Sequence, residues 1–309
     1  MGHSTPPPRP DIHATKPVPV WHPARWIGGA ALLLFVLLFV RLLVLNENLQ
    51  WHVVAAYLFS PEILAGLGRT LLLTFLAMVF GLAIGVVLAI MRLSSNPVFQ
   101  SASWLWIWFF RGVPPLVQLV FWYNLALLIP TVSLGIPFGP QLWSGSTNLL
   151  ITPFSAAILG LSLTETAYAA EMIRAGIQAI SVGQTEAAAT LGMTRAQILR
   201  RIILPQALRI LIPPIGNDTI SMLKFTSLVS VLALPDLLYS AQMIYSRTYQ
   251  TIPLLIVATI WYLILSTALT FGEHYIEHRL HGRPLALGAI FSSILKSKFW
   301  APRRQEVRS

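Results

Sequence analysis

Long apolar segments separated by basic connections constrain this chain more than any other feature of its sequence. Each approaches the roughly 20 apolar residues that a helix needs to cross a bilayer core. The segments lie at residues 26–45, 63–91, 113–129, 153–173, 215–234 and 252–271. The sequence therefore predicts an all-α integral membrane protein with about six transmembrane helices.

Two local patterns refine this prediction. Gly81 and Gly85 are four residues apart in the second segment, a spacing that lets two helices approach closely. Three tryptophans precede the third segment and are predicted to lie at the membrane interface, as aromatic side chains often do. They are Trp104, Trp106 and Trp108.

The composition supports lipid as the solvent for much of the surface. Hydrophobic residues make up 55% of the 309 residues and charged residues only 10%, whereas soluble domains carry about 25% charged residues. The chain has no cysteine, which excludes disulfides, thiolate metal sites and a cysteine nucleophile. Nucleic-acid binding would require the net charge of +10 to gather on one soluble face, but these charges lie between apolar segments.

The distribution of lysine and arginine predicts the orientation. With six helices and a cytoplasmic N-terminus, 17 of the 21 Lys and Arg residues fall in cytoplasmic segments, Arg92 and Arg111 among them. Only Arg247 falls in an outer loop; Arg41, Arg69 and Lys224 lie within or at the ends of spans. Since positive loops remain inside, we expect a multi-pass protein of the cytoplasmic (inner) membrane with both termini cytoplasmic.

The cytoplasmic segment 174–214 is too polar to span a membrane. Its part from Glu186 is a strong helix former, and Gly192 can supply the positive φ of a turn. A second, amphipathic helix should follow, with Ile198, Ile202 and Ile203 on its apolar side and Pro205 at its end. Two short helices around a tight turn on the cytoplasmic side predict a docking element.

This segment carries a specific pattern: Glu-Ala-Ala, three residues, Gly, nine residues, then Ile-x-Leu-Pro. It resembles, without a mismatch, the signature loop of permeases of bacterial ATP-binding-cassette importers. The matching residues, to which the resemblance assigns coupling to the ATPase, are Glu186, Ala187, Ala188, Gly192, Ile202, Leu204 and Pro205.

The flanking residues are similar to the polar amino-acid importers of the histidine, glutamine and glutamate type. The run from Ala167 to Glu171 and the run from Lys224 to Leu228 carry this similarity. The run from Arg111 to Gln118 resembles the family's Arg-Gly-Thr-Pro-Leu-x-x-Gln element, departing from it at Val113 and Pro115. The resemblance implies import of a polar amino acid or close analogue.

The resemblance also implies partners. Such an importer has two membrane subunits, identical or related, two cytoplasmic ATP-binding subunits and an extracytoplasmic amino-acid-binding protein. This chain would be one membrane subunit and not itself an enzyme. In agreement, none of the four lysines follows a glycine, so the Gly-Lys-[Ser/Thr] ending of a phosphate-binding loop is missing. No cofactor or metal is expected.

Composition and the resemblance together divide the chain into four parts. Residues 1–25 form a proline-rich cytoplasmic tail expected to be disordered, and 26–45 form a helix additional to the family's usual core of five. Residues 60–280 form the permease transmembrane domain with the coupling loop 174–214, and 281–309 form a basic cytoplasmic tail.

Charged residues inside spans are costly and usually functional. Glu165 or Glu171 could accept the ammonium group of an amino acid, and Lys224 or Thr226 could bind its carboxylate. Alternatively, Glu171 pairs with Arg174 one turn on, or Lys224 neutralises an acid on a neighbouring helix. The residues predicted to line the substrate path are Arg111, Gln118, Glu165, Tyr168, Glu171, Lys224, Thr226 and Ser227.

Several other functions remain open from the sequence. An ion-coupled secondary transporter could use Glu165, Asp218 and Lys224, and a structural membrane anchor would not need them. His274, His278 and His281 have a spacing that could hold zinc, although a solvated helix end is the preferred interpretation. A basic group could bind anionic lipid headgroups instead of an ATPase; it consists of Arg195, Arg200 and Arg201.

Overall fold

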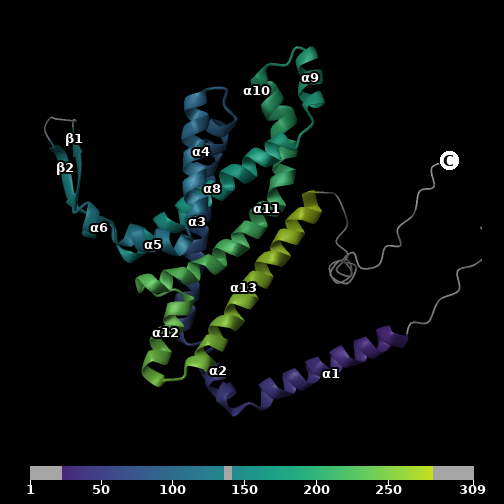
Figure 1. Cartoon of the computed structure of the whole chain (residues 1–309), viewed down its shortest axis with the longest axis vertical. Helices are drawn as coiled ribbons and strands as arrows, with labels where there is room; N and C mark the ends of the chain where they lie inside the picture. Colours follow the sequence, from purple (N-terminus) through teal and green to yellow (C-terminus); the bar gives the residue numbers. More distant parts are fainter. Residues whose placement is uncertain (1–22, 136–140, 281–309) are drawn as a thin grey trace, which may run out of the picture. The chain divides into compact units, whose positions relative to one another are not determined.

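The computed structural model describes residues 23–135 and 141–280 (Figure 1). The chain divides into two compact units, Met1–Trp51 and His52–Ser309. The predicted basic tail 281–309 lies outside the described residues, as does all but the end of the predicted proline-rich tail 1–25.

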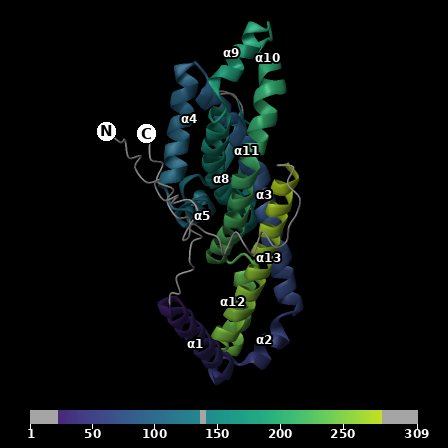
Figure 2. The same cartoon turned by 90° about the vertical axis from the view of Figure 1, so that its right-hand side faces the viewer.

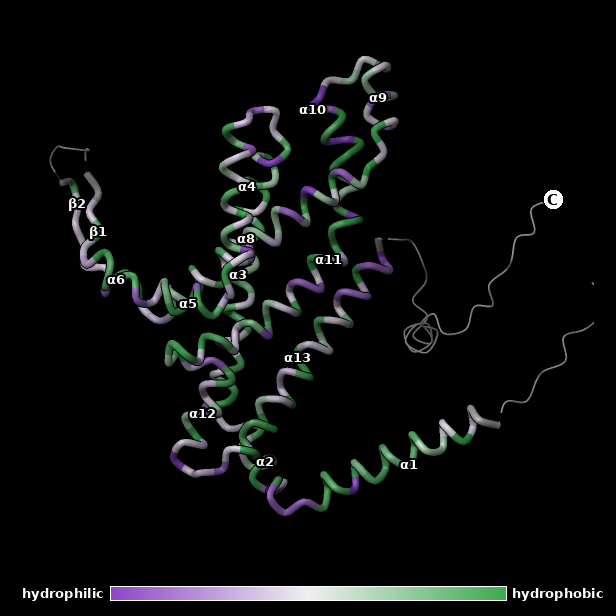
Figure 3. Tube along the Cα trace, viewed as in Figure 1, coloured by the Kyte–Doolittle hydropathy of each residue, from purple (hydrophilic) through white to green (hydrophobic). Residues whose placement is uncertain are grey.

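The first unit contains the predicted N-terminal helix. α1, Pro23–Leu45, is followed by the 3₁₀ turn η2, Glu47–Leu49, and the Trp51 indole donates to the Leu43 carbonyl at 3.3 Å. Every side chain from Trp26 to Leu45 is exposed, and the helix is apolar over most of its length (Figure 3). Its length and apolarity suffice to cross a bilayer.

The second unit is organised by two long helices. After the short α2, Trp51–Tyr57, α3 spans Pro61–Leu93, with Ser60 as its N-cap and proline at its first position. α8, Pro153–Gln178, begins with a capping box between Thr152 and Ser155. α3 and α8 make the most extensive helix–helix contact, and α4, α5 and α11 also pack on α8. α8 is therefore the central helix of the bundle.

The predicted third span, 113–129, is wrong as a single helix. The chain instead forms α4, Pro97–Gly112, and α5, Pro115–Tyr123, which meet at a bend of 99°. Pro114 and Pro115 cause the break, because proline lacks an N–H and disfavours helical backbone in the residue before it. The three tryptophans predicted to precede this helix lie inside α4.

A β-hairpin that the sequence did not predict follows α5. After α6, Leu125–Leu128, strands β1, Thr131–Gly135, and β2, Gln141–Ser146, pair antiparallel with Thr131 opposite Ser146. At its base, Thr147 donates its backbone N–H to Pro130 and its hydroxyl to the Ile129 carbonyl. The short α7, Thr147–Leu150, then leads into α8.

The segment after α8 is helical, as predicted, but its boundaries differ. α9, Val182–Thr190, and α10, Arg195–Ile198, flank the turn at Gly192; the π-helical turn η3, Leu199–Ile203, runs directly into α11, Leu204–Phe225. The prediction that Pro205 ends a helix is wrong. Pro205 lies in the first turn of α11, where the missing N–H is tolerated.

The fifth predicted span, 215–234, begins too late. α11 starts at Leu204, contains Pro213 and Pro214, and continues as the 3₁₀ helix η4, Thr226–Leu232. Ala233, in the left-handed region with φ +55°, ends η4, and α12, Leu237–Thr248, follows. α13, Thr251–Leu280, contains the sixth predicted span, 252–271.

The number of spans agrees only in part with the prediction. Among the described residues, three helices are long and apolar enough to cross a membrane, or up to five if each bent pair counts as one span; the number six is not confirmed. α8 is less apolar than these three. Because half of its side chains are buried among other helices, it need not be apolar all round.

The second unit has two distinct ends. α9 and α10 lie at one end and α12 and α2 at the other, in both views (Figures 1 and 2). α4 lies in the half of the unit that carries α9 and α10. The two ends therefore present different surfaces.

Candidate functional site

The α9–α10 segment has the helix–turn–helix form that the sequence predicts. Gly192 adopts φ +77°, and the N–H groups of Gly192 and Met193 donate to the carbonyls of Ala189 and Ala188 at 3.0 and 3.2 Å. These bonds satisfy carbonyls at the end of α9. The predicted left-handed turn is confirmed.

Contacts on both sides hold this turn in place. Thr194 and Gln197 form a capping box that starts α10. The Gln206 amide donates to the Gln184 side chain at 2.6 Å and so connects α11 to α9. The tip remains exposed: Leu191 is 83% exposed.

The first cavity lies where α4, α8 and α11 meet. Its volume is about 410 Å³. The lining side chains are Arg111, Tyr168, Glu171, Met172, Pro214, Asn217, Asp218 and Ser221. Three of the predicted path residues, Arg111, Tyr168 and Glu171, are thus brought together. The cavity presents a cation, acids, an amide and hydroxyls, which suits a polar molecule of both charges.

Arg111 forms the cationic side of this cavity. It lies in the last turn of α4, and its guanidinium carbon is 5.4 Å from the centroid of the Tyr168 ring on α8. This is a cation–π contact. Within the described residues Arg111 makes no ion pair, so its guanidinium N–H groups are available to a ligand.

Asp218 and Glu165 form the acidic side. Glu165 is only 1% exposed, and its carboxyl interacts with that of Asp218 on α11. One oxygen of each, Glu165 Oε1 and Asp218 Oδ2, is buried without a hydrogen-bond partner. Buried polar atoms are rarely left unsatisfied, and of the two residues only Asp218 lines the cavity, where its carboxyl group can meet a cationic group.

Gly81 makes room for this acidic pair. A Cβ atom built on Gly81 would overlap the side chain of Glu165, and one on Gly85 would lie 2.6 Å from the Ala169 Cβ. The close approach of α3 that the glycine spacing predicts is therefore confirmed, and α8 is the helix approached. It places Glu165 against the α3 backbone.

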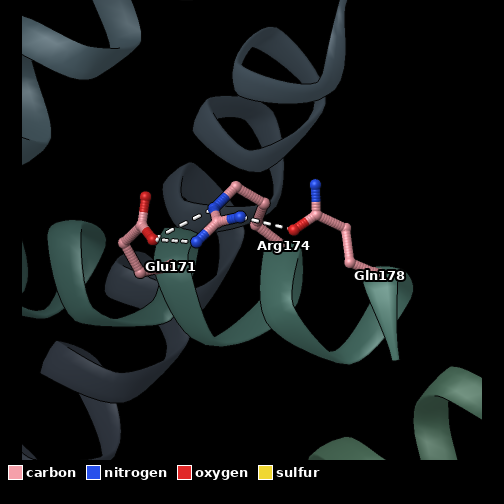
Figure 4. Close-up of polar contacts among 3 residues, drawn as sticks. All are labelled: Glu171, Arg174 and Gln178. Carbon is pink, nitrogen blue, oxygen red and sulfur yellow. Dashed lines mark hydrogen bonds and ion pairs between the residues drawn. The ribbon is translucent and has the colours of Figure 1, made fainter.

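Glu171 forms the ion pair that the sequence offered as an alternative role. Arg174 donates to Glu171 Oε2 through Nη2 at 2.7 Å and through Nε at 3.0 Å, and it also bonds the side chain of Gln178 (Figure 4). Glu171 still lines the cavity, but Arg174 neutralises its charge. It is a weaker cation acceptor than Asp218.

Gln118 is a buried brace between helices. Its Nε2 donates to the carbonyls of Phe110 and Val113 at 3.0 and 2.9 Å, and its Oε1 accepts from the Thr164 hydroxyl at 3.0 Å. These bonds satisfy the end of α4 and attach the bend between α4 and α5 to α8. Gln118 fixes the position of Arg111 and does not line the cavity.

The remaining predicted path residues lie elsewhere. Lys224 is exposed, Thr226 is buried and donates to the Leu223 carbonyl at 2.7 Å, and Ser227 donates to the Lys224 carbonyl. None of the three lines the cavity around Asp218.

Sequence reasoning missed three polar residues of the cavity. Asn217, Asp218 and Ser221 come from α11, and Ser221 lies about one helical turn beyond each of the other two. Asp218 was noted as a charge within a span but was not selected. Its pairing with Glu165 depends on how α11 packs on α8, which no local pattern specifies.

A second cavity adjoins the first. Its volume is about 550 Å³, and it shares Arg111 and Glu171 with the first. The other lining residues are Arg92, Trp104, Ile107, Trp108 and Gly112. Over the described residues, no group of three or more His, Asp or Glu side chains could hold a metal ion, and His281 of the zinc alternative lies outside them.

Comparison with known proteins identifies relatives of this chain among transport permeases. Residues 81–282 match the family described as binding-protein-dependent transport system inner membrane component. The chain is 42% identical over 277 residues to the arginine transport system permease protein ArgU of Corynebacterium glutamicum, covering 89% of this chain and 85% of the relative. It is 35% identical to the probable glutamine ABC transporter permease protein GlnM of Bacillus subtilis, covering 70% and 91%.

A solved structure shows the same fold. The crystal structure of an amino acid ABC transporter with histidines matches with a TM-score of 0.61 and 36% identity, over 72% of this chain and 95% of that chain. The chain therefore belongs to the family of inner-membrane components of binding-protein-dependent transport systems and is the permease subunit of an amino-acid importer.

Proposed function

We propose that the amino acid imported through this permease is a basic one, such as arginine, and that it is recognised in the cavity between α4, α8 and α11. The observation that carries the proposal is the placement of opposite charges. Arg111 from α4 and Asp218 from α11, which is backed by the buried Glu165, line the same cavity.

The charges of a basic amino acid fit this arrangement. Its α-carboxylate would bind the Arg111 guanidinium, a charge-assisted pair that can be bidentate. Its side-chain cation would bind the carboxyl group of Asp218, which lines the cavity and is backed by the buried Glu165. A neutral amino acid would leave the Asp218 carboxyl group without a cationic partner. Leaving a buried acceptor unpaired costs more free energy than a typical hydrogen bond contributes.

The names of relatives support the same substrate class. Two of them, ArgU of Corynebacterium glutamicum and ArtQ of Bacillus subtilis, are named as arginine transport permeases. The solved relative is described with histidines, another basic amino acid.

Removing the charge of Asp218 tests the substrate. In proteoliposomes with the complete importer, Asp218→Asn should lower arginine uptake about tenfold or more, because a hydrogen bond to a charged group contributes about 1.5–3 kcal/mol. Glutamine uptake should fall less, so the arginine-to-glutamine ratio should drop. Glu62→Gln, an exposed acid in the first turn of α3, is the control. Equal loss for both amino acids would contradict a basic substrate.

The exposed α9–α10 segment is proposed to dock on the ATP-binding subunits. In this family ATP hydrolysis belongs to separate subunits, and the segment's pattern suits such contact. The proposed coupling residues are Glu186, Ala187, Ala188, Gly192, Ile202, Leu204 and Pro205. Movement of the docked segment would reach the cavity through α11, which carries both η3 at its start and Asp218.

The other proposed partners are an extracytoplasmic amino-acid-binding protein and a second permease subunit. We also propose both termini to be cytoplasmic, with 26–45 as an additional span before the permease domain 60–280. Of the Lys and Arg residues expected in cytoplasmic segments, one does not support this orientation. Arg111, taken as a loop residue, lies in α4 roughly 20 Å along the helix from its start.

Cysteine labelling tests this orientation, because the chain has no cysteine of its own. An impermeant thiol reagent added to intact cells should label Ser133→Cys in the β-hairpin. It should label Thr190→Cys, at the end of α9, only after the membrane is opened. Both residues are exposed, so access alone does not separate them. The reverse pattern would invert the orientation.

A further inference from the structure

The second cavity continues the first toward one end of the bundle. Arg111 and Glu171 line both cavities. From Arg111, at the far end of α4, the second cavity passes Trp108 and Trp104 on successive turns of the helix and reaches Arg92 in the last turn of α3. It thus leads away from Asp218 along α4.

Arg92 is a second cation without a protein partner. Its Nε is buried and makes no hydrogen bond, and within the described residues Arg92 forms no ion pair. The acid that lines this cavity, Glu171, is bound to Arg174. Arg92 and Arg111 are therefore uncompensated, and the cavity can accept an anionic group at either of them.

Trp104 and Trp108 form an aromatic wall between the two arginines. Their rings are nearly parallel, with centroids 6.3 Å apart and an angle of 15°, and the residues are 52% and 60% exposed. Indole faces attract cations. The wall can therefore hold a positive group while an arginine holds the carboxylate of the same molecule.

We propose that this second cavity is the exit subsite of the permease, and that Arg92 receives the carboxylate of the amino acid as it leaves Arg111. The cationic end would leave Asp218 for the faces of Trp104 and Trp108. The proposal rests on the proposed recognition of a basic amino acid in the first cavity, and it adds a path for its release.

The difference between the two subsites gives this path a direction. In the first cavity the cationic end meets the carboxyl group of Asp218, which forms no ion pair within the described residues. In the second it meets only ring faces and a carboxylate that Arg174 already binds. Because ring faces attract a cation less strongly than a carboxylate does, the amino acid is held less tightly in the second cavity. A weaker site after a stronger one favours release.

The second cavity also leads toward the end of the second unit that carries α9 and α10. Arg92 lies four residues before Asn96, the N-cap of α4. α4 lies in the half of the unit that holds α9 and α10 (Figures 1 and 2). That is the side on which the proposed ATP-binding subunits would dock, so substrate released there would enter the cytoplasm.

Arg92→Gln in the reconstituted importer tests the exit subsite. The maximal rate of arginine uptake should fall about tenfold, as expected for loss of a charge-assisted carboxylate contact, while the KM should change less than about twofold. Arginine bound to the complex should dissociate more slowly. Arg92→Lys keeps the charge and should retain most of the rate. Arg279→Gln, in the last turn of α13, controls for loss of a basic residue at a helix end.

Three results would overturn the proposal: an unchanged maximal rate, a raised KM with normal turnover, or loss of folded complex in both Arg92 variants. A defect seen only in vesicles with anionic lipid would also overturn it, because Arg92 would then bind a lipid headgroup. Failure here is distinct from failure of the proposed substrate, since Asp218→Asn reports on the first cavity alone through the arginine-to-glutamine ratio.

Discussion

Replacing Gly192 with valine should abolish ATP-driven uptake while the permease inserts and accumulates normally. Gly192 has φ +77°, which β-branched residues avoid, so the substitution strains the backbone by about 1–3 kcal/mol. That strain is small for the whole protein but large for the geometry of one exposed turn. Because α9 and α10 would separate at a new angle, the docking surface would no longer fit the ATP-binding subunits.

The strain acts through the backbone and not through crowding. A Cβ atom at Gly192 would meet nothing within 4 Å, so a small residue that tolerates the left-handed region should restore function. Gly192→Asn should therefore keep most of the uptake. Gly183→Val, a neighbouring glycine in α9 without a positive φ, should be close to wild type.

The measurements are arginine uptake, ATP hydrolysis and copurification of the ATP-binding subunits. Wild-type uptake by Gly192→Val with normal copurification would show that this turn is not the coupling element. Loss of permease from the membrane would show instead that the turn is needed for folding.

Local patterns predicted those features of the fold that local chemistry determines. The apolar runs located α1, α3 and α13, because lipid-facing helices must be apolar over their length. The positive φ of Gly192 and the close contact at Gly81 and Gly85 also follow from residue type and spacing. These are properties of a few neighbouring residues.

Features that depend on breaks in a helix were predicted poorly. Pro114 and Pro115 divide a run that looked like one span, whereas Pro205 and the pair Pro213–Pro214 lie inside continuous helix. A proline at the first turn of a helix, or one whose lost bond is compensated nearby, does not end it. The outcome depends on tertiary packing and is not visible in the proline itself.

The functional site shows the same division. Charges within spans identified Glu165 and Glu171, and the spacing of Glu171 and Arg174 already offered their ion pair as an alternative. Nothing in the sequence indicated that Asp218 joins Glu165. Gln118 was predicted to line the substrate path, but its side chain hydrogen-bonds α4 to α8 instead. A polar residue within a span is expected to have an interaction partner. Only the packing of the helices shows whether that partner is the substrate or another part of the protein.

Leucine at Gly85 should prevent stable folding of the permease, whereas leucine at Gly68 of the same helix should not. A Cβ atom on Gly85 would lie 2.6 Å from the Ala169 Cβ, 3.2 Å from the Ala170 nitrogen and 3.3 Å from the Thr166 carbonyl oxygen. Two of these atoms belong to the α8 backbone, which cannot move without shifting the central helix. Overpacking of this kind costs about 1–3 kcal/mol or more, here at the most extensive helix contact.

Gly68 provides the matched control, because a Cβ atom there would meet nothing within 4 Å. Gly68→Leu should be neutral or slightly stabilising, since leucine favours helix over glycine by about 0.5–1 kcal/mol. Thermal unfolding in detergent should show a lower Tm, or no folded fraction, for Gly85→Leu only. An equal Tm for both variants would mean that α3 and α8 can separate at little cost. The position of Glu165 against the α3 backbone would then not be fixed by this helix contact, and neither would the position of its pair with Asp218.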